Sequence, residues 1–378
     1  MLSHGYPPTV SGVTLVVRKF SQALVRRGHR VMVVTASESR RPYQTEDRGV
    51  HLRRVRAFPN PFWKEGPIPL VGLGELGDII KTFQPDVIHT HEGAILGNQL
   101  LRLRDEIAVP LVSSCYYLPR YVTHYLTWGT HLINWVMWKY AVWHFNKFDH
   151  VVYSTATQRD FYLEQGLRAP TTIISNGLDT DHYKPGAEGV AEVESGYNLP
   201  PRPRVLFVGR LMKDKKIDVL IQAMAQVCAG RDAHLLLVGR GDERGELEAL
   251  AAEICVKDRV HFLGFVPEED LPAIYRASDI FAITSTSEVQ SIPTLQAAAT
   301  GLPVVAAAAA ALPELVQDGK NGTLVPPDDV AAIGRAILEI ISSPDRAACM
   351  GQSSLAVGRA HAEERSFEKL ETFYRELI

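Results

Sequence analysis

Cysteine is scarce in this sequence. The chain of 378 residues contains four cysteines, and none of them belongs to a Cys-x-x-Cys pair. They are Cys115, Cys228, Cys255 and Cys349. Such isolated thiols favour neither a structural zinc site nor a disulfide framework. The sequence therefore predicts reduced, buried thiols.

Long apolar runs are also missing. Charged or turn residues interrupt every apolar stretch before about 18 positions, the length that a membrane-spanning helix requires. The N terminus lacks the basic and then apolar pattern of a secretory signal. We therefore expect a cytoplasmic protein with no transmembrane helix.

The length and charge of the chain suggest two unlike halves. A chain of 378 residues exceeds the roughly 250 to 300 residues at which a single core stops growing. Residues 1–170 carry 20 Lys and Arg against 13 Asp and Glu, whereas residues 171–378 carry 20 against 30. A basic half can serve nucleic acid, an anionic membrane surface or only solvent.

Apolar runs rich in β-branched residues alternate with helical patterns along both halves. Such runs are typical of buried parallel strands, and their alternation with helices indicates doubly wound sheets. The expected strands are 31–35, 86–90, 110–114, 150–154, 204–208, 233–238, 259–263, 279–284 and 302–306, with a very short first strand at 1–3. The expected helices include 16–27, 219–227, 245–255 and 267–277.

These repeats predict an α/β fold of two facing Rossmann-like domains with a ligand cleft between them. We expect one domain at 1–170, a second at 171–353 and a closing helix at 354–378, with 185–204 as a rim loop. In open parallel sheets, ligands bind beyond the C-terminal ends of the strands. We therefore expect the functional residues near the C-terminal ends of the strands.

Three patterns that suggest a cofactor or a metal have simpler interpretations. Gly72, Gly74 and Gly77 spell G-x-G-x-x-G, but the strand that a dinucleotide site needs before it is missing. Asp179 and Asp181 fit a turn better than a metal site. On a strand, the side chains of His89 and His91 would share a face from which Glu92 points away, which disfavours a three-ligand site. We expect neither cofactor nor metal.

A basic segment is the strongest candidate site. Gly209 and Arg210 end a predicted strand, and three lysines follow at 213, 215 and 216 before a helix begins. Cations and backbone amides at a strand-to-helix turn suit a diphosphate, although a solvated basic loop is the alternative. Farther along, Glu288 and Gln296 are spaced to share one helical face. In the first half, Ser11 and Gly12 open the first helix, where a backbone can approach a ligand closely.

Together these segments resemble the family-four glycosyltransferases, which are retaining enzymes with the GT-B fold. The resemblance covers nearly the whole chain and rests on motifs spread along it. They are Tyr6–Gly12, Arg27–His29, Pro85–His91, Ser175–Asp179, Val208–Arg210 with Lys215, Leu263–Val266 and Leu312–Glu314.

The resemblance implies roles for individual residues. Arg210, Lys215 and Glu288 are the implied catalytic residues, the first two on the diphosphate and the third on the donor sugar. Gln296 is expected at the ribose and the backbone near Phe265 at the base. The remaining expected donor contacts are Ser11, Gly12, Gly209, Val289, Gln290 and Ser291.

This sequence departs from the family at three places. Gln296 stands where the family has Glu, and Ala310 and Ala311 replace the usual pair of glycines before Leu312. Tyr116 aligns with a frequent histidine of the family. An amide can still accept a hydrogen bond from one hydroxyl and donate one to another. We therefore expect ribose binding at Gln296 to weaken without being lost.

The stretch from Tyr116 to Tyr125 resembles bacterial diacylglycerol glucosyltransferases, which implies a lipid acceptor and places Tyr116 and His124 on the acceptor side. A cluster of tryptophans follows, and it fits either a lipid–water boundary or a buried helix. These are Trp128, Trp135, Trp138 and Trp143. The expected location is therefore the cytoplasmic face of an anionic membrane, with no nucleic-acid partner.

The sequence thus predicts transfer of a hexose from a UDP-sugar or GDP-sugar to an acceptor hydroxyl, with retention at the anomeric carbon. Arg210 and Lys215 would stabilise the leaving diphosphate without a metal. Two alternatives stay open. One is a catalytically silent nucleotide-sugar binding protein, and the other is an enzyme of the same fold that acts on the donor alone, such as an epimerase or a phosphorylase.

Overall fold

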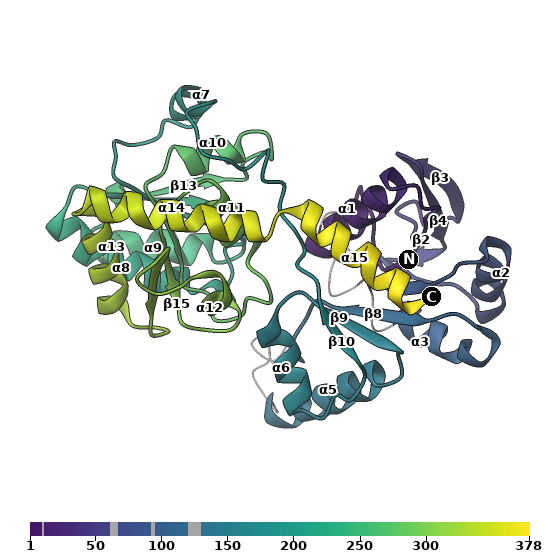
Figure 1. The fold of residues 1–378 in the computed structure, drawn as a ribbon. Helices are drawn as coiled ribbons and strands as arrows, with labels where there is room; N and C mark the ends of the chain where they lie inside the picture. The colour runs from purple at the N-terminus through teal and green to yellow at the C-terminus, as the bar shows by residue number, and fades with distance from the viewer. Residues whose placement is uncertain (10, 61–66, 92–94, 120–129) are drawn as a thin grey trace. The chain divides into compact units, whose positions relative to one another are not determined.

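The computed structural model describes residues 1–378 except 10, 61–66, 92–94 and 120–129. The chain forms two compact units, which are coloured along the chain in Figure 1. Unit 1 comprises Met1–Asn176 together with Glu364–Ile378, and unit 2 comprises Gly177–Glu363. The expected boundaries were 170 and 353, with a closing helix at 354–378. In the structure the residues from Glu364 onward belong to unit 1.

Unit 1 is built on an 8-stranded sheet in the order β10-β9-β8-β7-β1-β2-β4-β3. All neighbours are parallel except β3 and β4, which pair antiparallel at the edge. The strands are β1 (Leu2–Ser3), β2 (Met32–Ala36), β3 (Tyr43–Asp47), β4 (Val50–Val55), β7 (Ile88–Thr90), β8 (Leu111–Cys115), β9 (His150–Tyr153) and β10 (Thr171–Ile173). A separate 2-stranded ribbon pairs β5 (Ala57–Phe58) with β6 (Ile68–Pro69).

The helices of unit 1 cover this sheet. Among the described residues they are α1 (Gly12–Arg26), α2 (Leu73–Phe83), α3 (Ile95–Arg102), η1 (Arg104–Glu106), α5 (Thr130–Phe145), α6 (Ala156–Glu164) and α15 (Glu363–Leu377). The apolar side of α15 packs in the same core as α1. The rings of Phe20 and Phe367 meet edge to face there, with their centroids 5.5 Å apart. Arg27 of the α1 C terminus pairs with Glu371 at 3.1 Å. The last helix is therefore held in unit 1 by apolar and ionic contacts.

Unit 2 contains a 6-stranded, fully parallel sheet in the order β13-β12-β11-β14-β15-β16. Its strands are β11 (Arg204–Val208), β12 (His234–Val238), β13 (Val260–Gly264), β14 (Ile280–Ile283), β15 (Val304–Ala307) and β16 (Gly322–Val325). The strand order reverses between β11 and β14. This reversal is the topological switch point at which open parallel sheets bind ligands.

Helices lie on both faces of the second sheet, and each face has its own apolar core. They are α7 (Val190–Gly196), η2 (Lys213–Lys215), α8 (Ile217–Gly230), α9 (Arg244–Glu253), η3 (Lys257–Arg259), α10 (Leu271–Arg276), α11 (Ile292–Ala299), α12 (Leu312–Leu315), α13 (Val330–Ile341) and α14 (Pro344–Ala360). The segment 354–378, expected as one closing helix, is divided between the end of α14 and α15. In the described residues, no helix is long and apolar enough to cross a membrane.

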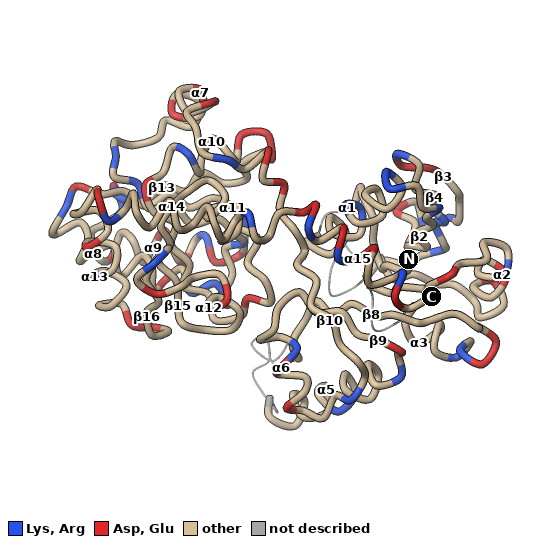
Figure 2. Tube along the Cα trace, in the orientation of Figure 1, with Lys and Arg blue, Asp and Glu red and all other residues tan. Residues whose placement is uncertain are grey.

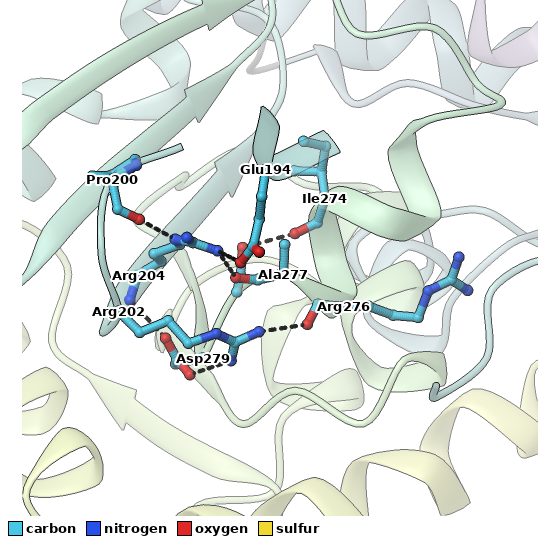
Figure 3. Close-up of polar contacts among 9 residues, drawn as sticks. Glu194, Pro200, Arg202, Arg204, Ile274, Arg276, Ala277 and Asp279 are labelled. Carbon is cyan, nitrogen blue, oxygen red and sulfur yellow. Dashed lines mark hydrogen bonds and ion pairs between the residues drawn. The ribbon is translucent and has the colours of Figure 1, made fainter. Parts of the chain in front are cut away.

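The segment 185–204, expected to be a loop, contains the helix α7, and a buried arginine fixes the segment to the second sheet (Figure 3). The guanidinium of Arg204 donates to Pro200 O at 2.6 Å and to Ala277 O at 2.9 Å, and it pairs with Glu194 at 2.6 Å. Asp279 accepts from the Arg204 amide at 2.7 Å and from Arg202 at 2.7 Å. A buried charge is tolerated only when it is paired and hydrogen-bonded in this way. The segment before β11 is thus anchored to the end of α10.

Candidate functional site

The candidate site lies where β11 and β14 end, side by side at the switch point of unit 2. The loop after β11 runs from Gly209 to Lys216, and the loop after β14 runs from Thr284 to Ser291. Hydroxyl groups connect the two loops. Thr284 Oγ1 donates to the carbonyls of Lys215 and Lys216, and Ser285 Oγ donates to Asp214 O at 3.2 Å. These bonds set the relative positions of the two loops.

Lys215 is the centre of the site. Its Nζ lies 2.7 Å from Glu288 Oε1 and 3.4 Å from Asp214 Oδ2. Burial disfavours the charge on Lys215, but the two carboxylates outweigh burial and raise the pKa of the ammonium above its usual range. Lys215 is therefore a permanent cation at neutral pH.

Asp214 is held in its charged form by the same cluster. Burial acts to raise its pKa, but Lys215, the Ser287 hydroxyl and Arg210 together lower it below the ordinary value. Ser287 Oγ donates to Asp214 Oδ2 at 3.0 Å. Asp214 and Glu288 thus place two carboxylates on one ammonium.

Other cations surround this cluster. Arg210 is exposed, yet it is close enough to contribute to the electrostatics of Asp214 and Lys215. Lys216 turns away to pair with Asp328 at 3.1 Å, and Lys213 lies 4.0 Å from Glu243. The basic segment is therefore not a uniformly solvated loop, because the Lys215 side chain is only 14% exposed and pairs with Glu288 after β14.

Glycines allow the neighbouring loops to approach one another. A Cβ on Gly239 would lie 1.9 Å from Gly209 O, and a Cβ on Gly241 would lie 2.1 Å from Leu211 O. The loop after β12 thereby stacks on the loop after β11. At the end of β13, Phe265 is 63% exposed, and the guanidinium of Arg240 lies 5.5 Å from its ring centroid. The residue whose neighbouring backbone was expected at the base thus has an exposed aromatic side chain with a guanidinium over its ring.

The predicted relation between Glu288 and Gln296 is wrong. The helix α11 begins only at Ile292, with Ser291 as its N-cap, so Glu288 lies in the preceding loop rather than on a helical face. Gln296 is 7% exposed, and its Oε1 accepts a hydrogen bond of 2.9 Å from Tyr275. Proline at position 293 and the Ser291 cap explain the late start of the helix.

The remaining predicted donor residues fall in two places. Val289, Gln290 and Ser291 join Glu288 in the loop after β14, and Gly209 joins Arg210 after β11. Ser11 and Gly12 lie in unit 1, where Ser11 caps α1 through a capping box with Thr14. The predicted donor residues are thus divided between unit 1 and unit 2.

The first unit has its own polar cluster at the ends of β7 and β8. Tyr116 Oη lies 2.7 Å from His91 Nδ1, and Ser114 Oγ lies 2.8 Å from His89 Nε2. The two imidazole rings stack with centroids 4.2 Å apart, so the two histidines share a face as predicted. Burial lowers the pKa of His91 to about 3. His124 and Trp128 lie outside the described residues.

Metal ligands do not gather in the part of the chain that the structure describes. No group of three or more His, Cys, Asp or Glu side chains there could hold an ion. Asp179 Oδ1 accepts from the amides of Asp181 and His182, each at 3.0 Å. This pattern is an Asx turn, and it supports the interpretation of Asp179 as a turn residue.

Sequence reasoning missed several members of the site. Asp214, Thr284, Ser285 and Ser287 lie within the two site loops, and Arg240 lies in the loop after β12. Asp214 stands directly between two lysines, and both serines shortly precede Glu288, so their proximity in sequence to predicted residues was a usable signal. Arg240 gave none, because its relation to Phe265 depends on the pairing of β12 with β13.

Two glycosyltransferase families match the chain. The family described as "Glycosyltransferase Family 4" matches residues 10–182, and "Glycosyl transferases group 1" matches residues 202–343. The first match lies largely in unit 1, and the second lies in unit 2 and includes the candidate site.

Similar curated proteins include glycolipid enzymes. A GDP-mannose-dependent alpha-(1-6)-phosphatidylinositol monomannoside mannosyltransferase of Mycolicibacterium smegmatis is 34% identical over 52% of this chain and 54% of its own length. Sulfoquinovosyl transferase SQD2 of Arabidopsis thaliana is 27% identical over 85% and 62%. Alpha-monoglucosyldiacylglycerol synthase of Streptococcus pneumoniae is 27% identical over 90% and 77%. The chain thus spans little more than half the length of the first two relatives.

Solved structures share the fold. Sucrose-phosphate synthase from Thermosynechococcus elongatus superposes with a TM-score of 0.84 at 25% identity, covering 100% of this chain and 98% of that chain. WaaG, a glycosyltransferase involved in lipopolysaccharide biosynthesis, gives a TM-score of 0.73 at 16% identity, covering 98% of each chain, and supports the fold alone. With parallel sheets in two units and family matches to both, this chain belongs to the family-four glycosyltransferases with the GT-B fold.

Proposed function

We propose that this protein transfers a hexose from a nucleoside diphosphate sugar to an acceptor hydroxyl, with retention at the anomeric carbon. The observation that carries the proposal is the position of Arg210, Lys215 and Glu288 at the switch point of unit 2. That point is where a doubly wound sheet binds its ligand. The donor in this proposal is a UDP-sugar or a GDP-sugar.

The proposed chemistry depends on stabilising the leaving group. Negative charge grows on the diphosphate as the glycosidic bond breaks, and a buried cation stabilises such charge more than a solvated one does. The proposed partners of the two phosphates are Lys215, whose side chain is 14% exposed, and Arg210, which is exposed. Glu288 is the proposed partner of the sugar hydroxyls. In this proposal no metal takes part.

Donor contacts outside this cluster are also proposed. Phe265 and Arg240, which follow β13 and β12, would contact the base, and Gln296 on α11 would contact the ribose. Gly209, Val289, Gln290 and Ser291 would contribute from the two site loops. Ser11 and Gly12 remain proposed donor contacts on the basis of the family resemblance.

A lipid acceptor is the proposed acceptor class. The names of two relatives specify a glycolipid, phosphatidylinositol monomannoside for a mannosyltransferase and alpha-monoglucosyldiacylglycerol for a synthase. In unit 1, α5 exposes large apolar side chains, among them Leu132 at 66%, Trp135 at 58% and Trp143 at 54%. Tyr116 and His124 are the proposed acceptor-side residues.

The sequence around α5 supports contact with an anionic membrane. No acidic residue occurs between Glu106 and Asp149, whereas Lys139 and Lys147 are exposed on and after α5. Elsewhere in unit 1 acidic residues are interspersed among basic ones (Figure 2). Exposed aromatics with nearby lysines suit a lipid–water boundary. We propose peripheral attachment to the cytoplasmic face of the membrane through this helix.

The experiment is a transfer assay with radiolabelled UDP-sugars and GDP-sugars and a panel of acceptors that includes diacylglycerol. Labelled glycolipid whose anomeric configuration by NMR matches the donor would support the proposal. Activity that persists in EDTA would support the absence of a metal. Binding without turnover would instead favour the silent binding protein, for which Gln296 and the alanines at 310 and 311 are the motivating departures. Turnover without any acceptor would favour an enzyme acting on the donor alone.

A further inference from the structure

The ion pair between Lys215 and Glu288 joins two groups that have different proposed partners. Their charged atoms are 2.7 Å apart, and their side chains are 14% and 12% exposed. In the proposed reaction Lys215 binds the diphosphate and Glu288 binds the sugar. A carboxylate that stays on Lys215 would compete with the diphosphate for the same ammonium and would also repel it.

We propose that Glu288 exchanges between Lys215 and the donor sugar, and that its return to Lys215 after transfer promotes release of the nucleoside diphosphate. This inference rests on the proposed function and deepens it for the same site. It concerns unit 2 alone.

The sugar makes the forward exchange favourable. Sugar hydroxyls can donate hydrogen bonds to a carboxylate, so Glu288 leaves one partner only when another is present. After transfer the nucleoside diphosphate has no sugar, and Glu288 loses those donors while an anion lies nearby. The ammonium of Lys215 then offers Glu288 a charge-assisted hydrogen bond, as it does at 2.7 Å in this structure, which drives Glu288 back to Lys215.

Asp214 allows Lys215 to stay in place during the exchange. Its Oδ2 lies 3.4 Å from Lys215 Nζ and also accepts from Ser287 at 3.0 Å. The ammonium therefore keeps one carboxylate partner when Glu288 departs. The serine bond holds that carboxylate against the loop after β14, so that Glu288 is the carboxylate that moves.

The exchange predicts that the protein distinguishes product from substrate through Glu288. A nucleoside diphosphate must displace Glu288 without offering it new partners, whereas a nucleotide sugar offers them. Free UDP or GDP should therefore bind more weakly than the corresponding nucleotide sugar. Removing the charge of Glu288 should reverse that preference.

Calorimetric titration of the full chain with UDP, GDP and their glucose and mannose forms tests this inference. In Glu288→Gln we expect the nucleoside diphosphate to bind about tenfold more tightly, or about 1.4 kcal/mol. The nucleotide sugar should show no such gain. Stopped-flow measurement should show slower release of the nucleoside diphosphate. Adding Lys215→Met to Glu288→Gln should remove the gain.

Glu243→Gln is the matched control, because Glu243 Oε1 lies 4.0 Å from the Nζ of Lys213, another lysine of the loop after β11. It should leave both affinities unchanged, and an equal gain in this variant would show a general charge effect and overturn the exchange. Should Glu288→Gln fail to fold, Glu288→Asp replaces it, since a shorter side chain reaches Lys215 less well and should shift affinity in the same direction. Unchanged or weaker nucleoside diphosphate binding in a folded Glu288 variant would overturn the exchange while the proposed function stands. A wild-type protein that binds none of these nucleotides would overturn both.

Discussion

The phenol of Tyr275 on α10 donates a hydrogen bond of 2.9 Å to Gln296 Oε1 on α11. Tyr275 is fully buried and Gln296 is 7% exposed. The bond fixes which end of the amide faces α10, so the Nε2 end faces the other way. Gln296 is therefore an oriented donor at a position where the family resemblance implies a carboxylate acceptor.

Tyr275→Phe should lower the free energy of unfolding by about 1 kcal/mol, because it leaves the buried Gln296 Oε1 without this donor. Urea denaturation measures the change. Tyr197→Phe is the matched control, since its phenol donates to Asp270 at 2.7 Å in a partly exposed position where water can replace it. Equal decreases in the free energy of unfolding of the two variants would show that the Tyr275 hydrogen bond stabilises the fold no more than the Tyr197 bond does.

Arg210→Ala should reduce kcat/KM at least tenfold while the protein stays folded. A hydrogen bond to a charged group contributes about 1.5 to 3 kcal/mol, and Arg210 is exposed, so its removal costs the fold little. Steady-state kinetics and thermal unfolding measure the two effects. Arg244→Ala, at an exposed arginine whose guanidinium lies 5.5 Å from the Phe262 ring centroid, should leave kinetics unchanged. Unchanged kinetics in Arg210→Ala would remove Arg210 from the site.

Most strands of both sheets could be predicted, because parallel strands are buried on both faces and appear as continuous apolar runs. The runs at 204–208 and 233–238, for instance, correspond to β11 and β12. The edge strand β3 could not be found this way, since Tyr43–Asp47 is polar and largely exposed. Nor does sequence show which sheet α15 covers, because its apolar face would fit either core.

The residues of the site could be predicted better than their contacts. Lys215 and Glu288 were each found from the strand ends that precede them, but the hydrogen bond between them spans 73 positions. That contact exists because β14 pairs with β11 rather than with β13, a choice of strand order that local patterns do not carry. The same order brings Asp214 to Ser287, and it explains why Asp214 was missed.

Ala310→Gly should raise the free energy of unfolding by about 0.5 to 1 kcal/mol. Ala310 has φ +49°, a left-handed conformation that costs a residue with a Cβ about 1 to 2 kcal/mol, part of which the greater freedom of glycine in the unfolded chain offsets. Ala311 has φ −88°, so Ala311→Gly should instead lower the free energy of unfolding. Thermal and urea unfolding distinguish them. A loss of stability in both variants would contradict the argument.

The stability of the protein should fall as the pH drops below 6.5, in part because of His91. Burial lowers its pKa from 6.5 to about 3, so the unfolded chain binds a proton between these values that the folded chain does not. The contribution is present above pH 6.5 and is lost as the pH falls towards 3. At pH 5.5 the expected loss is about 1.4 kcal/mol for this group.

His91→Gln should therefore flatten the stability profile between pH 7 and pH 5, as measured by urea unfolding at each pH. His51→Gln is the control, because the His51 side chain is 51% exposed and its replacement should leave the slope unchanged. If the profile of His91→Gln kept the wild-type slope, His91 would not be the group responsible.

The apolar face of α5 provides the test of membrane attachment. Trp135 and Trp143 are 58% and 54% exposed, whereas Trp138 packs edge-on against Tyr162 at 4.9 Å. Each exposed indole that enters a lipid interface should contribute about 2 kcal/mol, and each nearby basic residue about 1 kcal/mol, the latter fading within a Debye length as salt rises. Wild-type protein should sediment with anionic vesicles at low salt, bind neutral vesicles poorly and dissociate as salt increases.

The double variant Trp135→Ser/Trp143→Ser should lose most of this sedimentation without a change in thermal stability, because neither side chain is buried. Phe58→Ser is the matched control, at an exposed aromatic of the β5–β6 ribbon that is 53% exposed and should not affect binding. Trp138→Ser should instead destabilise unit 1, since it removes a packed ring. Wild-type protein that stays in the supernatant with every vesicle, or a double variant that sediments like the wild type, would contradict attachment through α5. Neither result would contradict the roles proposed for Arg210, Lys215 and Glu288, because these residues lie in unit 2.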